Sequence, residues 1–209
     1  MSARRIIILG PPGAGKGTQA ALLAKKLNLS HIATGDILRD EVKRATPLGL
    51  QAKRYMESGE LVPDAVIINI VKGKLERLEG FVLDGFPRTL KQAQALDGLK
   101  IDIALNIKLS REELIERLSG RRVCPRCGRN YHLHSEPPRN DLRCDLCGEK
   151  LIARSDDRPE VIARRYDVYQ QESAPVVEFY RKKSILKEID GSRAIGVVFQ
   201  EMFNLVNEV

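Results

Sequence analysis

The run best suited to chemistry is Gly10-Pro11-Pro12-Gly13-Ala14-Gly15-Lys16-Gly17-Thr18. Its Gly-x4-Gly-Lys frame follows an apolar segment and precedes a helical pattern, which is the context of a phosphate-binding loop. Glycines let backbone N–H groups point at phosphate oxygens, the helix start adds positive potential, and Lys16 reaches the outer phosphates. A turn that binds nothing does not require this lysine. The strict pattern has Ser or Thr directly after the lysine; here Gly17 intervenes, so Thr18 would supply the Mg²⁺-facing hydroxyl.

A carboxylate ends a second apolar segment, in Leu83-Asp84-Gly85-Phe86-Pro87-Arg88. A carboxylate at a strand end beside a phosphate loop can hold Mg²⁺ or its waters. The planar, always charged guanidinium of Arg88 suits a phosphate. Without the glycine-rich loop, Asp84 could equally cap a turn and Arg88 could lie on the surface.

All four cysteines fall in two Cys-x2-Cys pairs, Cys124/Cys127 and Cys144/Cys147. This spacing matches a tetrahedral four-thiolate Zn²⁺ site that is closed to water, hence structural. Disulfides are the alternative, and the absence of a secretory signal disfavours them. His132 and His134 lie inside the loop, but four thiolates complete the shell. We therefore expect both histidines to be surface or packing residues.

The chain carries 35 basic and 28 acidic residues, a net charge of +7, which indicates an anionic partner: nucleic acid, a membrane surface or a phosphorylated small molecule. Residues 120–165 alone hold eleven basic and seven acidic residues. A solvated charged face is the simpler explanation for most of these arginines. A rigid flap with cations at its root could instead close over a polyphosphate and exclude water.

The length of 209 residues and 43% hydrophobic content predict one large globular domain with an insertion. No apolar stretch approaches the roughly 18 residues of a membrane span. The basic start, Met-Ser-Ala-Arg-Arg, is followed by an apolar run, Ile6–Leu9, that is too short for a secretory signal. We expect a cytosolic protein.

Strands alternate with helices along the chain, which predicts a parallel sheet covered on both faces. Strands are expected at residues 4–9, 81–83, 101–109 and 185–189. Helices are expected from the glycines to Asn28, from a cap at Asp64 to Gly80, from Thr89 to Leu99, and from a Ser110/Glu113 capping box to Gly120. A last helix has one apolar face formed by Ile195, Val198, Phe199, Met202, Phe203 and Val206. Residues 101–109 alternate apolar and polar, which a strand covered on both faces should not need.

In these motifs the chain resembles bacterial adenylate kinases of the long type, in the version whose lid carries a zinc knuckle. The resemblance covers nearly the whole chain. It rests on the loop at 10–18 with its Gly17, Thr34-Gly35-Asp36 with Arg39, Leu61-Val62-Pro63-Asp64, Asp84 to Thr89 with Gln92, and Gly120-Arg121-Arg122.

The resemblance implies the P-loop nucleoside monophosphate kinase fold, an α/β parallel sheet flanked by helices, in three parts. These are a core of residues 1–32, 63–119 and 158–209, a monophosphate-binding part at 33–62, and a zinc-containing lid at 120–157. It implies reversible, Mg²⁺-dependent transfer between ATP and AMP to give two ADP, in a cytoplasmic monomer with no nucleic-acid or membrane partner.

Site residues follow from the resemblance position by position. It implies that ATP is held by Gly13, Ala14, Gly15, Lys16, Gly17, Thr18, Arg117, Arg121, Asn130, Tyr131 and Arg193. It implies that AMP is held by Thr34, Gly35, Arg39, Leu61, Val62, Gly85, Phe86, Pro87, Arg88, Gln92, Arg154 and Arg165, with Gln92 at the adenine edge. The implied catalytic cations are Lys16, Arg88, Arg121, Arg154 and Arg165. Thr18 and Asp84 would contact magnesium-bound water, and Cys124, Cys127, Cys144 and Cys147 would bind Zn²⁺.

The chemistry agrees with this assignment, because phosphoryl transfer needs positioning and cations rather than a covalent intermediate. A phosphate oxygen of AMP is already a nucleophile, so no general base is expected. Asp156 and Asp157 could orient metal-bound waters or cap a helix that begins near Pro159. Two other functions stay open: a kinase for another monophosphate, and a nucleic-acid-binding regulator with a zinc ribbon.

Overall fold

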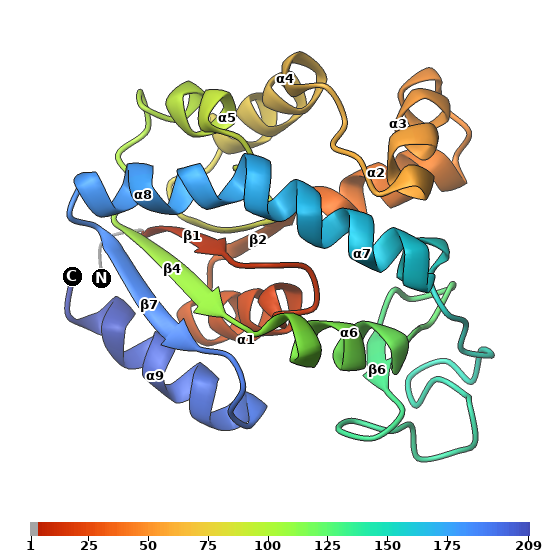
Figure 1. Ribbon diagram of the computed structural model, residues 1–209. Helices are drawn as coiled ribbons and strands as arrows, with labels where there is room; N and C mark the ends of the chain where they lie inside the picture. The colour runs from red at the N-terminus through yellow and green to blue at the C-terminus, as the bar shows by residue number, and fades with distance from the viewer. Residues whose placement is uncertain (1–3) are drawn as a thin grey trace.

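The computed structural model describes residues 4–209, so the first three residues of the predicted core segment and of the basic start lie outside it. Its centre is a five-stranded, all-parallel sheet in the order β2-β3-β1-β4-β7. The strands are β1 (Arg5–Leu9), β2 (Ser30–Ala33), β3 (Phe81–Asp84), β4 (Ile103–Lys108) and β7 (Leu186–Asp190). The predicted α/β class is confirmed (Figure 1).

Helices cover both faces of this sheet. The helices of the core are α1 (Lys16–Leu27), α4 (Asp64–Leu75), α5 (Leu90–Ala95), α6 (Arg111–Ser119), α7 (Pro159–Val168), α8 (Ala174–Lys182) and α9 (Ile195–Asn207). A π-helical turn, η2 (Tyr169–Ser173), joins α7 to α8, and a 3₁₀ turn, η1 (Ser155–Asp157), precedes α7. Among the described residues no helix is long and apolar enough to cross a membrane.

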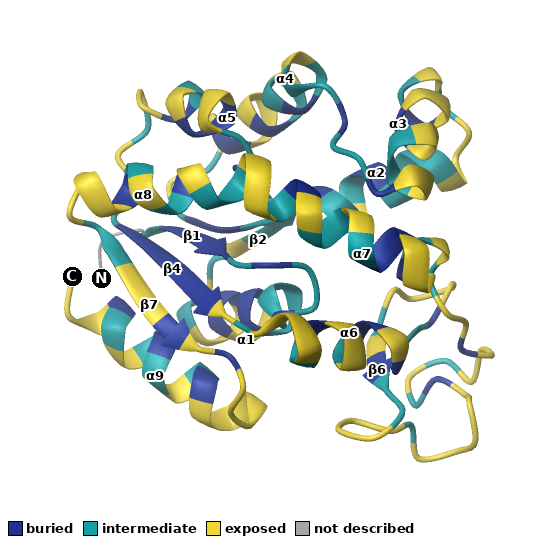
Figure 2. Cartoon of the chain, in the orientation of Figure 1, coloured by how far each residue is buried: buried dark blue, intermediate teal, exposed yellow. Residues whose placement is uncertain are grey.

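Alternate side chains of each strand enter two separate cores. On one face, Ile6 and Ile8 pack with Leu23 of α1 and Met202 of α9. On the other face, Ile7 of β1 and Phe81 and Leu83 of β3 pack with α4, α5 and α8. The central strands β1, β3 and β4 are therefore buried except at one end residue each, and β1 and β4 are mostly dark in Figure 2. Strand β1 lies between β3 and β4, so its carboxyl end meets the ends of both neighbours.

Two segments project from the carboxyl edge of the sheet. The first consists of α2 (Thr34–Lys43) and α3 (Pro47–Ser58), which pack closely because Gly49 has no side chain: a Cβ there would lie 2.0 Å from the Glu41 carbonyl oxygen. The second contains a two-stranded antiparallel sheet of β5 (Arg121–Val123) and β6 (Asn130–His132) followed by irregular loops. The two segments approach each other where the Lys43 ammonium donates to the Pro125 carbonyl, 3.5 Å away.

Most predicted elements are present, with instructive differences at their ends. Asn28 ends α1 in a left-handed conformation, and the Ser110/Glu113 capping box begins α6. The predicted cap at Asp64 is wrong: α4 begins with Asp64 itself, and its cap residue, Pro63, donates and accepts no side-chain cap bond. The carboxylate of Asp64 instead accepts hydrogen bonds from α5 and the residue before it. Helix α4 ends at Leu75 rather than Gly80.

Three further expectations need correction. Helix α5 ends at Ala95, and the next turns, up to Leu99, are held by bonds between residues three apart. Ile195 is 40% exposed and does not belong to the buried face of α9. Strand β2 was missed, because Ser30–Ala33 shows neither an apolar run nor a clear alternation.

The polar residues at 102 and 106 explain the alternation that seemed out of place in β4. Asp102 lies before the strand, where its carboxylate accepts from the Arg5 backbone N–H at 2.7 Å. Asn106 is buried at 4% exposure within the strand. The strand is thus covered on both faces despite its pattern.

Candidate active site

The glycine-rich loop connects β1 to α1 at the centre of the carboxyl edge. Gly10, Gly13 and Gly15 adopt positive φ angles of 139°, 80° and 84°, which L side chains rarely adopt. Gly10 is also sterically required, because a Cβ there would lie 2.5 Å from the Ile107 carbonyl oxygen. Gly15 caps α1 without any side-chain bond, which leaves the first N–H groups of the helix free for an anion.

Lys16 folds back over this loop. Its ammonium donates to the carbonyl oxygens of Gly10 and Pro11, each 2.8 Å away. Burial lowers the pKa of Lys16 to about 7, although the negative charge of Asp84 opposes the shift. The positive charges of Arg88 and Arg165 lower the same pKa further. In this state the lysine is only partly charged near neutral pH, and an anion would restore its charge.

Asp84 stands at the end of β3, directly beside Ile8 of β1. A Cβ on Gly17 would lie 3.2 Å from the Asp84 carboxylate, so the glycine after the lysine leaves room for this acid. That contact is a physical reason for the departure from the strict loop pattern. A carboxylate and the Thr18 hydroxyl are hard oxygen donors of the kind that Mg²⁺ or its waters prefer, so these residues fit that ion.

Two cavities, of about 630 and 650 Å³, open along the carboxyl edge. The first, the loop cavity, is lined by Gly10, Pro12 and Lys16 and by residues of η2 and α8. The second, the clamp cavity, is lined by residues of α2, by Leu61 and Val62, and by Gln92. The residues common to both linings are Gly59, Leu61, Gly85, Arg88 and Arg165. The cavities therefore meet at two arginines.

Short contacts hold the shared arginines in place. Arg88 donates from Nε to the Gly85 carbonyl at 2.8 Å, and its own carbonyl accepts from the Ser173 hydroxyl at 2.9 Å. The π-helical turn η2 thus braces the loop that carries Arg88. Arg165 donates from Nη1 to the Asp156 carbonyl at 2.9 Å and to Asp157 Oδ1 at 3.1 Å, and it forms an ion pair with Asp156 Oδ2 at 3.0 Å. Burial, and then the positive charge of Arg165, lowers the pKa of Arg88, and burial lowers the pKa of Arg165.

Asp157 anchors a second arginine as well. Arg121, the first residue of β5, donates from Nε and Nη2 to the two oxygens of Asp157 at 2.7 and 2.5 Å. The Asp157 side chain is 2% exposed, so it is a buried carboxylate with two guanidinium partners. Neither Asp156 nor Asp157 caps α7: the cap residue is Arg158, which makes no side-chain cap bond. The capping alternative is wrong for both.

Arg154 completes the group of cations. Burial lowers its pKa to about 9, and the charges of Arg121 and Arg39 lower it further. Its Nη2 donates to Asn130 Oδ1 at 2.5 Å, while its buried Nε has no partner among the described residues. The Asn130 side chain therefore holds an arginine, a contact that the sequence did not suggest.

Most, but not all, of the residues expected to hold the monophosphate line the clamp cavity. Those that line the clamp cavity are Thr34, Gly35, Arg39, Leu61, Val62, Gly85, Arg88, Gln92 and Arg165. Pro87 lines only the loop cavity, and Phe86 is 1% exposed in the core beneath. Arg154 lines neither cavity.

Four side chains expected at the other nucleotide have partners of their own. Arg117 donates to the Gly191 carbonyl at 2.7 Å, and Arg193 pairs with Glu201 on α9. Tyr131 is 3% exposed and donates its hydroxyl to Cys144 Sγ, 3.4 Å away. With Asn130 bound to Arg154, only the backbone of residues 130–131 remains for a nucleotide on this strand.

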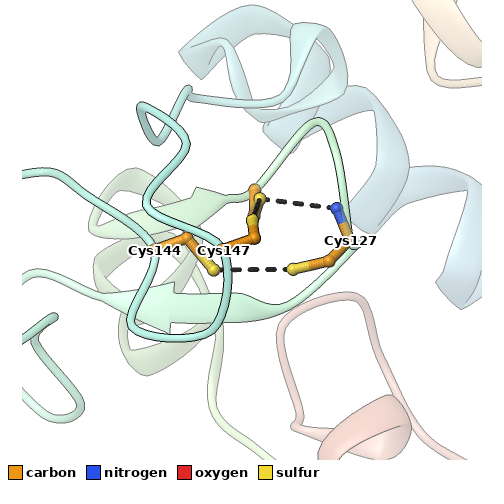
Figure 3. A group of neighbouring side chains, drawn as sticks. Cys127, Cys144 and Cys147 are labelled. Carbon is orange, nitrogen blue, oxygen red and sulfur yellow. Dashed lines mark hydrogen bonds between the residues drawn. The ribbon is translucent and has the colours of Figure 1, made fainter.

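The four cysteine sulfurs converge, and Figure 3 shows three of these residues, Cys127, Cys144 and Cys147. Cys124 and Cys147 lie 3.4 Å apart, Cys127 and Cys144 3.5 Å apart, and all four sulfurs lie within 4.8 Å of one another. A tetrahedral site with Zn–S bonds of about 2.3 Å separates its sulfurs by about 3.8 Å, so the set fits Zn²⁺. All four are free thiols, which excludes the disulfide alternative, and neither histidine of the loop belongs to the cluster.

The cysteine cluster has an outer hydrogen bond that the sequence did not reveal. The Tyr131 hydroxyl donates to Cys144 and accepts from the Asp145 backbone N–H at 2.8 Å. The bond from Tyr131 lowers the pKa of Cys144 to about 6. Favouring a thiolate in this way prepares the residue for a metal.

Comparisons with known proteins agree over nearly the whole chain. The family model described as adenylate kinase matches residues 8–185. The adenylate kinase of Clostridium beijerinckii is 48% identical, with 97% of this chain and 98% of that protein aligned. Those of Carboxydothermus hydrogenoformans and Methanothrix thermoacetophila are 47% and 46% identical, with 98% and 97% of this chain and 100% and 98% of those proteins aligned.

The two ion pairs of Asp157, with Arg121 and Arg165, give a stability prediction. Asp157→Ala leaves Arg121 and Arg165 facing each other without the buried carboxylate, and we expect a loss of about 3 kcal/mol in the free energy of unfolding. Chemical denaturation of the ligand-free protein measures it. Glu60→Ala is the matched control, since it removes an exposed partner of Arg164 and should cost under about 1 kcal/mol. Equal losses of unfolding free energy in the two variants would contradict this stabilising role of Asp157.

Proposed function

The chain belongs to the adenylate kinase family, and we propose that its two joined cavities hold the two nucleotides of a reversible transfer between ATP and AMP. The enzyme is a nucleoside monophosphate kinase. The observation that carries the placement is the sharing of Arg88 and Arg165 by both linings. Two phosphorylated ligands, one in each cavity, would meet at these guanidinium groups.

ATP occupies the loop side in this proposal. The N–H groups of residues 13–18 hold its phosphates, because the positive φ angles and the uncapped start of α1 direct backbone donors toward the cavity. Lys16 leaves the Gly10 and Pro11 carbonyls and contacts the outer phosphates. Arg117, Arg121, Arg193 and the backbone of residues 130–131 lie toward the lid and complete the site.

AMP occupies the clamp cavity. Thr34, Gly35 and Arg39 come from α2, Leu61 and Val62 from the segment after α3, and Gly85, Arg88 and Gln92 from the β3–α5 region. Arg39 and Arg88 are the cations for the AMP phosphate. Gln92 is 2% exposed, and we assign it to the adenine edge.

Transfer needs no proton acceptor. An oxygen of the AMP phosphate attacks the γ-phosphorus of ATP, the bond from that phosphorus to the β–γ bridging oxygen breaks, and ADP leaves from each side. Arg88, Arg165 and Arg154 offset the charge on the moving group, and Lys16 offsets the charge on the leaving phosphate. Mg²⁺, when bound with ATP, offsets phosphate charge and orients the oxygens, and Asp84 and Thr18 are the residues that would contact it or its waters.

We assign the three parts as a core of residues 1–32, 63–119 and 158–209, a clamp of 33–62 and a lid of 120–157. Closure of the lid excludes water from the junction. In support of this, Lys43 of the clamp contacts Pro125 of the lid in this conformation. One Zn²⁺ on the four thiolates stiffens the lid without taking part in chemistry, since such a shell leaves no open position. We also propose a monomer in the cytoplasm, whose reducing conditions suit free thiols.

A coupled assay for ADP tests the function directly. With Mg·ATP as donor, we expect AMP to be preferred over GMP, CMP and UMP, and turnover to require the magnesium. Arg88→Lys should lower kcat at least tenfold, because one ammonium cannot reproduce a bidentate contact in both cavities. Preference for any base but adenine would refute the assignment of AMP to the clamp cavity.

The lowered pKa of Lys16 predicts proton uptake when ATP binds. At pH 8 the free enzyme holds Lys16 mostly neutral, since its pKa is about 7, and the triphosphate favours the ammonium. Binding should take up roughly one proton at pH 8 and far less at pH 5.5, where the lysine is already charged. Calorimetry in buffers of different ionisation enthalpy measures it. Lys16→Met should abolish the uptake, whereas Lys72→Met, on the far side of α4, should not change it.

The thiol cluster predicts one tightly bound Zn²⁺ per chain, measurable by elemental analysis. Removing the metal should lower Tm by several degrees, because about 1 kcal/mol shifts Tm by 2–4 °C in a chain of this size. Tyr131→Phe removes the donor to Cys144 and should weaken zinc retention about tenfold against a competing chelator. Tyr166→Phe, whose hydroxyl contacts Gln170, is the control. If the protein is produced in zinc-containing medium, purified without chelators and still contains no metal, the assignment of a Zn²⁺ site would be contradicted.

A further inference from the structure

The side-chain amide of Gln92 is held at both ends. Its Oε1 accepts from the Arg88 backbone N–H at 2.7 Å. Its Nε2 donates to Asp64 Oδ1, also at 2.7 Å. The residue is 2% exposed and lines the clamp cavity, so both ends of the amide have protein partners at the border of the ligand space.

These two partners permit one orientation of the amide. A backbone N–H can only donate, and a carboxylate can only accept. Exchanging the oxygen and nitrogen of Gln92 would place a donor against the Arg88 N–H and an acceptor against Asp64. The orientation is therefore dictated by the chemistry of the partners and does not depend on how the amide atoms are assigned.

Thr89 fixes the carboxylate in turn. Its hydroxyl donates to Oδ1 and Oδ2 of Asp64, at 3.0 and 3.1 Å, and accepts from the Gln92 backbone N–H at 3.2 Å. Asp64 is the first residue of α4, where the positive end of the helix favours a negative side chain. The acid, the hydroxyl and the amide thus form one connected group between α4 and α5.

The bonding capacity left on Gln92 has a defined pattern. Nε2 keeps a second N–H, and Oε1 keeps a second lone pair. An N–H beside an acceptor oxygen matches an edge with a ring-nitrogen acceptor beside an amino donor, which is the N1/N6 edge of adenine. Hypoxanthine and guanine present the reverse pattern, N1–H beside a carbonyl oxygen. They would place a donor against the Gln92 N–H and an acceptor against Oε1.

We propose that Asp64 is a specificity-determining positioning residue that selects adenine by fixing the orientation of the Gln92 amide. The inference rests on the proposed function, because it takes Gln92 to lie at the base of AMP. Asp64 itself need not touch the nucleotide. Without its carboxylate, the amide keeps one partner, Arg88 N–H, and can rotate or present its other face.

The test compares AMP with IMP, which differ only at the base edge. Asp64→Ala should raise the KM for AMP about tenfold, the scale of one lost hydrogen bond to a charged group. It should raise the IMP-to-AMP ratio of kcat/KM at least tenfold. The KM for ATP and kcat with saturating AMP should stay within twofold, which a general structural defect would not allow.

Two further variants separate positioning from simple loss of a carboxylate. Asp64→Asn should restore most of the preference, because its Oδ1 can still accept from both Gln92 and Thr89. Glu112→Ala removes another acid from the first turn of a helix, α6, where its side chain has no hydrogen bond among the described residues, and it should leave both nucleotides unaffected. If Asp64→Ala does not fold, Thr89→Val, which frees the carboxylate, should shift the ratio in the same direction by a smaller factor.

The Gln92→Ala variant distinguishes failure of this inference from failure of the proposed function. An unchanged KM for AMP in Gln92→Ala would overturn the placement of adenine, and this inference with it. A raised KM in Gln92→Ala together with an unchanged IMP-to-AMP ratio in Asp64→Ala would overturn the role of Asp64 alone. In the Gln92→Ala background, Asp64→Ala should add less than twofold to the KM for AMP; a full tenfold effect would show that Asp64 acts by another route.

Discussion

Repulsion among the cations at the cavity junction is the constraint on which the rest of the structure depends. Two unit charges 4 Å apart interact by about 4 kcal/mol at an effective dielectric constant of 20, whereas a whole domain is stable by only about 5–15 kcal/mol. Several uncompensated pairs would therefore unfold the protein. Burial is the main cause of the lowered pKa of Lys16, Arg88 and Arg165, and the positive charges of neighbouring arginines lower each of these pKa values further. An anion with several charges reduces this repulsion. The same cluster of cations therefore both destabilises the free enzyme and gives it affinity for phosphates.

The fold supplies the counter-charges from fixed elements. Asp84 comes from the end of β3, and Asp156 and Asp157 from the short turn before α7. Asp157 ties a core helix to the first strand of the lid, since its two partners are Arg165 of α7 and Arg121 of β5. A single buried carboxylate thus lets two parts of the chain hold their arginines close together before any ligand binds. Because these arginines are already ordered in the free enzyme, nucleotide binding loses less side-chain conformational entropy.

The sequence was sufficient for features that depend on local chemistry. The strand-loop-helix at 5–27, the capping box at Ser110 and the thiol pairs all follow from short-range patterns, and the structure contains them. It was insufficient where a side chain finds its partner far along the chain. Asp64 resembled a helix cap, but its carboxylate accepts from residues 25 and 28 positions away. Tyr131 was expected at a nucleotide, but its side chain is buried and its hydroxyl donates to Cys144. No pattern within one helix or strand encodes such pairs, so only the tertiary fold reveals them.

The segment proposed as a lid, residues 120–157, gives a physical reason for a metal site away from the reaction. Its buried cluster consists of only Cys124, Tyr131, Cys144 and Leu151, and two of these four are thiols. So small an apolar group cannot offset the conformational entropy of ordering nearly forty residues of mostly exposed loop, at about 1–2 kcal/mol per residue. In the proposal, four thiolates around one Zn²⁺ would supply the missing free energy at a single point. Arg121 and Arg154 lie at the two ends of this segment, and Asn130, between the two thiol pairs, accepts from Arg154, so the positions of both arginines depend on the fold of the segment between them. The proposed metal would therefore act on the reaction through the placement of arginines, without contacting a substrate.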